Sequence, residues 1–203
     1  MKNMKNGVLA VFIVAQMSCL ASLGFAINTV PRDMGDEMLF SGKTRVGGFL
    51  GPVMKFSEIN DQFAALVGGR AGFIINRALL IGIEGYGLVN EIEVSTPRNR
   101  LLDFGYGGLF FGYVNRSQKL VHLSIHSLVG VGGLHYRPDY YYDWVDAIFV
   151  FEPGVDLMLN VTKRFRIGLG GTYRFVSDVD LDRLSNSDIG GPSASLVFKF
   201  GKF

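Results

Sequence analysis

The sequence has little that could cross-link or interrupt a fold. It contains one cysteine among 203 residues, Cys19, and only six prolines. Because Cys19 lies in an amino-terminal segment that we expect to be removed, the mature chain would have no disulfide bond to stabilise it. The net charge is +2 at pH 7 and no block of basic residues occurs, which argues against a nucleic-acid-binding protein.

Long apolar runs are also missing, except at the amino terminus. There, Lys2 and Lys5 precede an apolar stretch over residues 8–23, and the small residues Gly24 and Ala26 follow it. This order is typical of a secretory signal peptide that ends at residue 26. A retained anchor helix is the alternative, which the short apolar run disfavours. After residue 26 no run reaches the ~20 residues of a membrane-spanning helix, so none is expected.

The length that remains predicts a single domain. Removing 26 residues leaves 177. We expect residues 27–43 to form a polar N-terminal tail and residues 44–203 to form the domain. The chain has 27 glycines and 17 phenylalanines. Chains rich in glycine and aromatic residues, with many short alternating segments, are typical of all-β barrels.

The stretch 148–175 shows most directly what kind of strand the chain forms. Phe149 and Leu157 fall on one face at a period of two, and Glu152 and Asp156 fall on the other. Strands of ~9–11 residues span a bilayer when tilted, and alternation of apolar and charged side chains at this length is typical of transmembrane β-barrels. A soluble sandwich gives the same alternation with the burial reversed, so this stretch alone leaves both open.

Similar alternation elsewhere predicts eight strands in all. Their ranges are 44–56, 63–75, 79–91, 102–114, 120–136, 193–203, and two strands within 148–175. Short connections alternate with longer ones, which predicts short periplasmic turns at one end and longer extracellular loops at the other. The longer connections are residues 93–100, 137–146 and 177–191. The expected fold class is an all-β, eight-stranded antiparallel up-and-down transmembrane β-barrel.

The segment 102–114 fits the alternation least well. Leu109, Phe110 and Phe111 are consecutive apolar residues, so we expect a β-bulge or a change of phase near the preceding Gly-Gly pair. In a narrow barrel such glycines leave room for the large side chains that fill the interior. Gly-Gly pairs occur at 47-48, 68-69, 107-108, 132-133 and 170-171.

With these features the chain resembles the small eight-stranded outer-membrane β-barrels, the superfamily of the outer membrane protein A barrel domain and the opacity-like proteins. The resemblance covers residues 44–203 and includes the C-terminal Leu-Val-Phe-Lys-Phe-Gly-Lys-Phe. It implies contact with outer-membrane lipid and recognition of the terminal Phe203 by the barrel assembly machinery. Phe203 would then face lipid, which requires a kink at Gly201, because Phe198 and Phe200 belong to the opposite phase.

The strand phases direct several charged side chains into the barrel. They are Arg70, Glu84, Glu152, Asp156, Arg166 and Arg174, joined by His122 and His126. An eight-stranded interior is just filled by side chains, and buried ions require partners. We interpret this set as a structural ion network that plugs the lumen, with the two arginines of the seventh strand beside the two acids of the sixth. A proton or ion path is the alternative.

Two further segments carry residue types used in chemistry. His122 and Ser124 stand two apart on one strand, as in lipid A deacylases, but their phase points into the lumen and their position is near a short turn. Asp178, Asp180, Asp182 and Asp188 lie in one loop, yet Arg183 and Ile189 occupy positions where an EF-hand needs glycine and glutamate. We expect a solvated acidic loop there, with weak binding of a divalent ion as the alternative, and lumen packing for the histidine and serine.

Aromatic residues concentrate in one of the longer loops. Tyr140, Tyr141, Tyr142 and Trp144 lie within residues 137–146. They fit a girdle at the membrane interface or an exposed recognition surface.

The sequence therefore predicts a non-enzymatic integral barrel of the bacterial outer membrane, without cofactor or metal. Its role would be structural or interactive at the surface, with an extracellular ligand bound by the long loops. It is too narrow for a general porin. Two alternatives are a lipid-modifying enzyme that uses His122 and Ser124, and a soluble periplasmic barrel that binds a small apolar ligand.

Overall fold

The computed structural model describes residues 44–94, 100–137, 145–181 and 183–203. The expected signal peptide (1–26) and N-terminal tail (27–43) lie outside the described residues. Among the described residues, no helix combines the length and the apolar character needed to cross a membrane.

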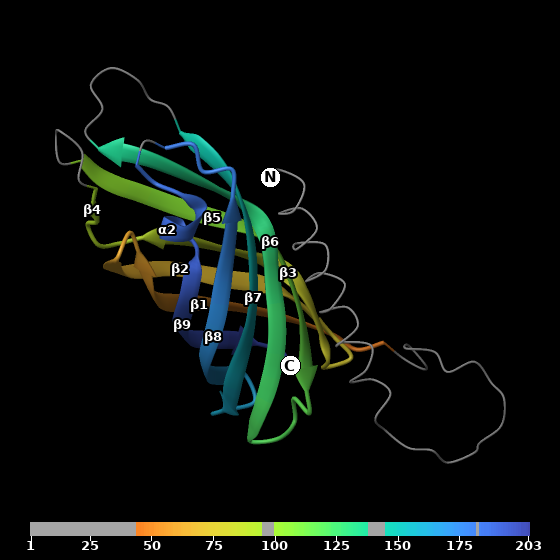
Figure 1. Ribbon diagram of the computed structural model, residues 1–203. Coiled ribbons are helices and arrows are strands. Elements are labelled where there is room, and N and C mark those ends of the chain that lie inside the picture. Colours follow the sequence, from red (N-terminus) through yellow and green to blue (C-terminus); the bar gives the residue numbers. More distant parts are fainter. Residues whose placement is uncertain (1–43, 95–99, 138–144, 182) are drawn as a thin grey trace, which may run out of the picture. The chain divides into compact units, whose positions relative to one another are not determined.

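Eight long strands, one short strand and one helical turn make up this part of the chain. The elements are β1 (Val46–Ile59), β2 (Gln62–Ile75), β3 (Leu79–Leu88), β4 (Glu93–Val94), β5 (Arg100–Asn115), β6 (Val121–Arg137), β7 (Asp146–Asn160), β8 (Phe165–Ser177), α2 (Asn186–Ile189) and β9 (Gly191–Gly201). The strands follow the order β3-β2-β1-β9-β8-β7-β6-β5-β4, and an additional pairing of β3 with β5 closes the sheet (Figure 1). All pairings are antiparallel, so the predicted up-and-down barrel of eight strands is confirmed.

The barrel has two different ends. One, which we name the turn end, carries the connections 76–78, 116–120 and 161–164 and both ends of the described chain, at 44–45 and 202–203. The other, the loop end, carries the turn at Asn60-Asp61, the longer connections, β4 and α2 (Figure 1). Asn60 and Asp61 both have positive φ, at 51° and 58°, as two-residue hairpin turns require.

The first and last long strands meet along one seam. β1 pairs with β9 from Phe49 opposite Gly201 to Ser57 opposite Ser193. The register has a gap around Pro52, which has no N–H to donate. This seam and the β3–β5 pairing leave no long strand with an open edge within the described residues.

The β-bulge expected near the third Gly-Gly pair is absent, so that prediction is wrong. β5 pairs without interruption with β3 on one side and β6 on the other. Phe110 is fully buried inside, whereas Leu109 and Phe111 are exposed outside. The apolar run arises because the lumen takes a phenylalanine here, where it packs with Phe49 and Ile74 near the turn end.

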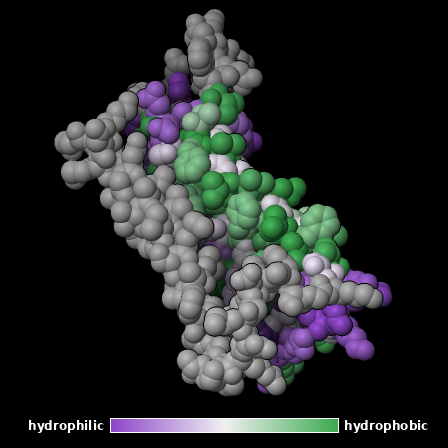
Figure 2. All heavy atoms as spheres, turned by 90° about the vertical axis from the view of Figure 1, so that its right-hand side faces the viewer, coloured by the Kyte–Doolittle hydropathy of each residue, from purple (hydrophilic) through white to green (hydrophobic). Residues whose placement is uncertain are grey.

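Large apolar side chains cover the outside of the barrel, and charged ones lie within it. Phe63 and Leu157 are 64% and 51% exposed, whereas Glu152 and Arg174 are at most 1% exposed. Figure 2 shows the apolar residues as a belt across the strands, with hydrophilic residues at both ends. A soluble sandwich would have the reverse arrangement. The belt therefore decides in favour of a transmembrane barrel.

Glycine pairs place one residue on each side of the wall. At Gly170, which faces inward, a Cβ would overlap Asp156 Oδ1 and Ser195 Oγ; at Gly171, which faces outward, a Cβ would meet nothing within 4 Å. The inward glycine therefore makes room for polar lumen side chains, which the sequence anticipated from the narrowness of the barrel.

The C-terminal strand keeps its alternation to the end, so the expected kink at Gly201 is wrong. Lys199 is buried inside, and Phe200 on the next position is exposed outside. Phe203 continues the inward phase: its ring packs against the inner apolar cluster and lies 3.8 Å from the Arg166 guanidinium. The terminal phenylalanine thus does not face lipid as we expected from the resemblance.

Candidate functional site

The barrel interior gathers the six charged side chains that were predicted to point inward. Each of the six, from β2, β3, β7 and β8, is at most 7% exposed. They are Arg70, Glu84, Glu152, Asp156, Arg166 and Arg174. His122 and His126 on β6 are buried as well. The period of two places them there, but their pairing depends on which residues meet across the lumen.

Arg70 is the centre of the network. Its Nε lies 2.5 Å from Glu84 Oε2, and its Nη1 donates a hydrogen bond of 2.7 Å to Asp156 Oδ2. Its Nη2 lies 3.0 Å from His126 Nε2, and its Nε is 3.3 Å from the Tyr86 hydroxyl. One guanidinium therefore joins groups from β3, β6 and β7 across the lumen. Its planar fork of donors suits this role better than a lysine would.

A second pair, which the sequence analysis missed, joins Lys55 of β1 to Glu152 of β7. The Lys55 ammonium forms an ion pair with Glu152 Oε1, and the Tyr106 hydroxyl donates a hydrogen bond of 2.5 Å to Glu152 Oε2. The ammonium also lies 3.6 Å from the centre of the Tyr86 ring. The signal was available in the sequence, because Lys55 alternates with the apolar Met54 and Phe56, which lie on the outer face.

Arg174 and Arg166 do not pair with the acids of β7, as we expected them to. Glu152 and Asp156 are occupied by Lys55 and Arg70, respectively. Arg174 Nε instead donates a hydrogen bond of 2.8 Å to the Ile189 carbonyl in α2, toward the loop end. Arg166 Nη2 donates one of 3.2 Å to the Ser117 carbonyl at the turn end. These arginines therefore tie the connections at either end to the barrel wall.

Apolar clusters lie on both sides of the ion network. Toward the turn end Phe49, Ile74, Leu80, Phe110 and Val114 pack together. Toward the loop end a larger cluster includes Leu184 and Ile189 from the 178–190 connection and Ile92 and Val94 from the segment around β4. α2 is held by a capping box in which Ser185 N donates 2.7 Å to Asp188 Oδ2. Side chains thus fill the lumen between its two ends.

The histidine and serine considered for catalysis do not form a working pair. His122 and Ser124 both point into the lumen and are at most 5% exposed. His122 Nδ1 lies 3.3 Å from the Lys119 carbonyl, and Ser124 Oγ has no hydrogen-bond partner among the described residues. A nucleophilic serine needs a base within hydrogen-bond reach. His122 and Ser124 are therefore not hydrogen-bonded to each other as a nucleophile and its base.

The loop residues considered for recognition and for metal binding are described only in part. Tyr140, Tyr141, Tyr142 and Trp144 lie outside the described residues, and so does Asp182. Asp188 caps α2, and the backbone N–H of Asp180 donates a hydrogen bond of 2.8 Å to Asp146 Oδ2. Within the described ranges, no group of three His, Cys, Asp or Glu residues could hold a metal ion.

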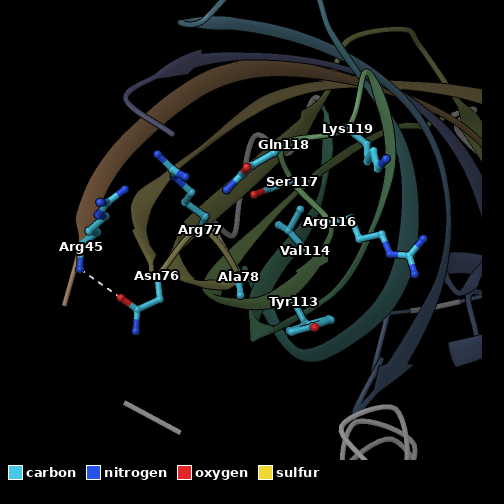
Figure 3. A pocket seen from close by; sticks show the side chains of 10 residues that line it. All are labelled: Arg45, Asn76, Arg77, Ala78, Tyr113, Val114, Arg116, Ser117, Gln118 and Lys119. Carbon is cyan, nitrogen blue, oxygen red and sulfur yellow. Dashed lines mark hydrogen bonds between the residues drawn. The ribbon is translucent and has the colours of Figure 1, made fainter. Parts of the chain in front are cut away.

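A hollow of about 780 Å³ lies at the mouth of the barrel at the turn end and opens to the exterior (Figure 3). Its lining contains four cations and no acidic residue. The charged members are Arg45, Arg77, Arg116 and Lys119. Two neighbouring hollows share Arg77 with it and add Lys163, Arg166 and Lys202. The sequence analysis assigned no function to these residues.

A solved structure has a fold similar to that of this chain. Neisserial surface protein A has 12% sequence identity to this chain and a TM-score of 0.59, over 80% of this chain and 100% of that one. The fold is that of the small eight-stranded outer-membrane barrels. Ail, the attachment invasion locus protein of Yersinia pestis, has 15% identity and a TM-score of 0.47, over 77% and 97% of the two chains. No protein-family model and no curated protein sequence matches this chain.

Proposed function

We propose that this protein is an integral, non-enzymatic barrel of the bacterial outer membrane, with a structural or surface-interactive role and no wide pore. The observation that supports the location is the exposed apolar belt around a charged interior (Figure 2). Such a surface is unfavourable in water and favourable in a bilayer. It also argues against the soluble periplasmic barrel, whose apolar residues would surround a ligand inside.

The filled lumen supports a role other than passage of solutes. The Arg70 and Lys55 ion pairs cross the middle of the barrel, and apolar clusters lie on either side of them. Charged pairs with no access to water hold the strands together but offer no path for a hydrated solute. The part of the molecule left to meet a partner is the loop end, through residues 93–100, 137–146 and 177–191. Phe203 remains our candidate for the signal read by the assembly machinery.

Cysteine labelling tests location and orientation together, because the expected mature chain has no cysteine of its own. Asp61→Cys and Asp180→Cys place a thiol at the loop end, and Arg116→Cys and Lys163→Cys place one at the turn end. On intact cells a membrane-impermeant maleimide should modify the first two and spare the others until the outer membrane is permeabilised. Equal labelling of all four, or recovery of the protein in the soluble periplasm, would refute the proposal.

A further inference from the structure

The two ends of the barrel carry opposite charge. The turn end has seven cationic side chains and no acidic one among its described residues: Arg45, Arg77, Arg116, Lys119, Lys163, Arg164 and Lys202. At the loop end, the residues that the structure describes include nine acids and three arginines. They are Glu58, Asp61, Glu91, Glu93, Asp103, Asp146, Asp178, Asp180 and Asp188, with Arg100, Arg137 and Arg183. The near-neutral net charge of the chain therefore hides a strong asymmetry along the barrel axis.

The turn-end cations form a ring, because every connection at that end supplies at least one. Arg77 comes from the β2–β3 turn, and Arg116 from the β5–β6 turn. Lys163 comes from the β7–β8 turn. Lys202 directly follows β9, and Arg45 directly precedes β1, which pairs with β9. These positions succeed one another around the closed sheet. We name the seven side chains the basic ring.

The basic ring borders the apolar belt. Lys119 is followed by Leu120, which is 67% exposed, and Lys163 comes two residues after Val161, which is 48% exposed. Lys202 directly follows β9 and comes two residues after Phe200, which is 44% exposed. Cations directly beyond a lipid-facing apolar belt lie at the level of the lipid headgroups, where long side chains can reach phosphate.

The exposed members of the ring have no acidic partner in the part of the chain that the structure describes. Within residues 44–94, 100–137, 145–181 and 183–203, no ion pair or hydrogen bond involves the side chains of Arg116, Lys119, Lys163 or Arg164. At the loop end, by contrast, Arg137 Nε lies 2.9 Å from Asp103 Oδ2. Figure 3 shows several of the ring's cations around the mouth, with no carboxylate among the residues that line the hollow. Within the described residues, the ring therefore presents positive charge without acidic partners.

We propose that the basic ring binds the phosphate groups of anionic phospholipids in the leaflet at the turn end. Anionic headgroups attract basic residues next to a membrane, by an amount that corresponds to about fivefold in affinity for each Lys or Arg. A ring that encircles the barrel beside its apolar belt matches a surrounding shell of lipid, whereas a docked protein or acidic polymer would meet one side of the mouth. This inference rests on the proposed membrane insertion.

Spin-labelled lipids measure the selectivity directly. The full-length protein is reconstituted in phosphatidylcholine bilayers, and electron paramagnetic resonance compares the immobilised fractions of spin-labelled phosphatidylglycerol and phosphatidylcholine. We expect the wild type to prefer phosphatidylglycerol by about fivefold, on the basis of one cation for each headgroup. The preference should weaken in 1 M salt, where the Debye length falls to about 3 Å.

Two matched triple variants separate the ring from overall charge. Lys119→Gln with Lys163→Gln and Arg164→Gln removes three turn-end cations, and Arg100→Gln with Arg137→Gln and Arg183→Gln removes three loop-end cations. Both lower the net charge by the same amount. The first should lose at least half of the preference, and the second should keep it. Equal losses in the two variants, or no preference in the wild type, would overturn the proposal.

A check for insertion keeps the two proposals apart. A heat-dependent gel shift and an immobilised lipid fraction show whether the protein has entered the bilayer. A protein that inserts and shows no selectivity refutes the basic ring alone and leaves the proposed function standing. A protein that fails to insert refutes both. Selective retention of the inserted wild type by an acidic polymer, without lipid selectivity, would assign the ring to a different partner and would also refute this proposal.

Discussion

Replacing Lys55 by methionine tests whether the lumen is a dry, structural ion network. Methionine has a similar length and no charge, so the change removes the cation and little else from the packing. The Glu152 carboxylate then stays buried without its cation, but it keeps the hydrogen bond from the Tyr106 hydroxyl. We expect a large loss in the free energy of unfolding.

The magnitude follows from the burial of both groups. Lys55 is fully buried and Glu152 is 1% exposed, so neither is screened by solvent. Removing one partner of a buried ion pair costs about 3–5 kcal/mol. The Tyr106 hydrogen bond stays with Glu152 and places the expected loss at the lower end, at about 3 kcal/mol. Adding Glu152→Gln removes the second charge and should bring stability back to within about 1 kcal/mol of the wild type.

Urea-induced unfolding from phosphatidylcholine vesicles, followed by the heat-dependent gel shift, measures these differences. The control is the exposed pair of Arg137 and Asp103, in which Arg137→Met should cost about 0.2–1 kcal/mol. A loss below 1 kcal/mol for Lys55→Met, or a double variant no more stable than the single one, would show that water reaches the network. The lumen would then be a hydrated path rather than a structural plug.

Two further predictions concern glycine and the loop-end cap. Gly170→Ala should destabilise the barrel measurably in the same unfolding assay, because the added Cβ would overlap Asp156 and Ser195. Gly171→Ala should leave the free energy of unfolding within about 0.5 kcal/mol of the wild type. Equal effects of the two variants would contradict the assignment of inner and outer faces. Arg174→Met removes the hydrogen bond to the Ile189 carbonyl, so the 178–190 connection should become faster to cleave by protease while the gel shift persists. An unchanged cleavage rate would show that Arg174 does not hold this connection.

Alternation along the sequence was enough to predict the fold and most of the charged side chains that point inward, although Lys55 and Lys199 were missed. The period of two depends only on the local geometry of a strand, so Glu84 and Asp156 could be placed inside without knowing their neighbours. The same rule accounts for Phe110, which is buried inside because Leu109 and Phe111, on either side of it, are outside. The expected bulge was wrong because an apolar residue can serve either face of a membrane barrel, so an apolar run need not signal a change of phase.

The pairing within the lumen could not be predicted from the sequence. Which charged side chains meet depends on the stagger of the strands and on distances across the barrel, and the alternation pattern reveals neither of these. Lys55 meets Glu152 from the far wall, and Arg174 bonds to a backbone carbonyl in α2 rather than to an acid. The basic ring was equally hidden, because its members are scattered through the sequence and come together only when the turns converge on one end.

The seam between β1 and β9 has a consequence for how the protein is made. The partner of the first strand is the last strand of the barrel in chain order, so the barrel cannot close until β9 has been synthesised. A chain that stops before β9 would present two unpaired strand edges, which readily join other chains. Closure of the barrel therefore depends on this one pairing: a chain that terminates before β9 should yield aggregates or degradation products in place of a shortened barrel.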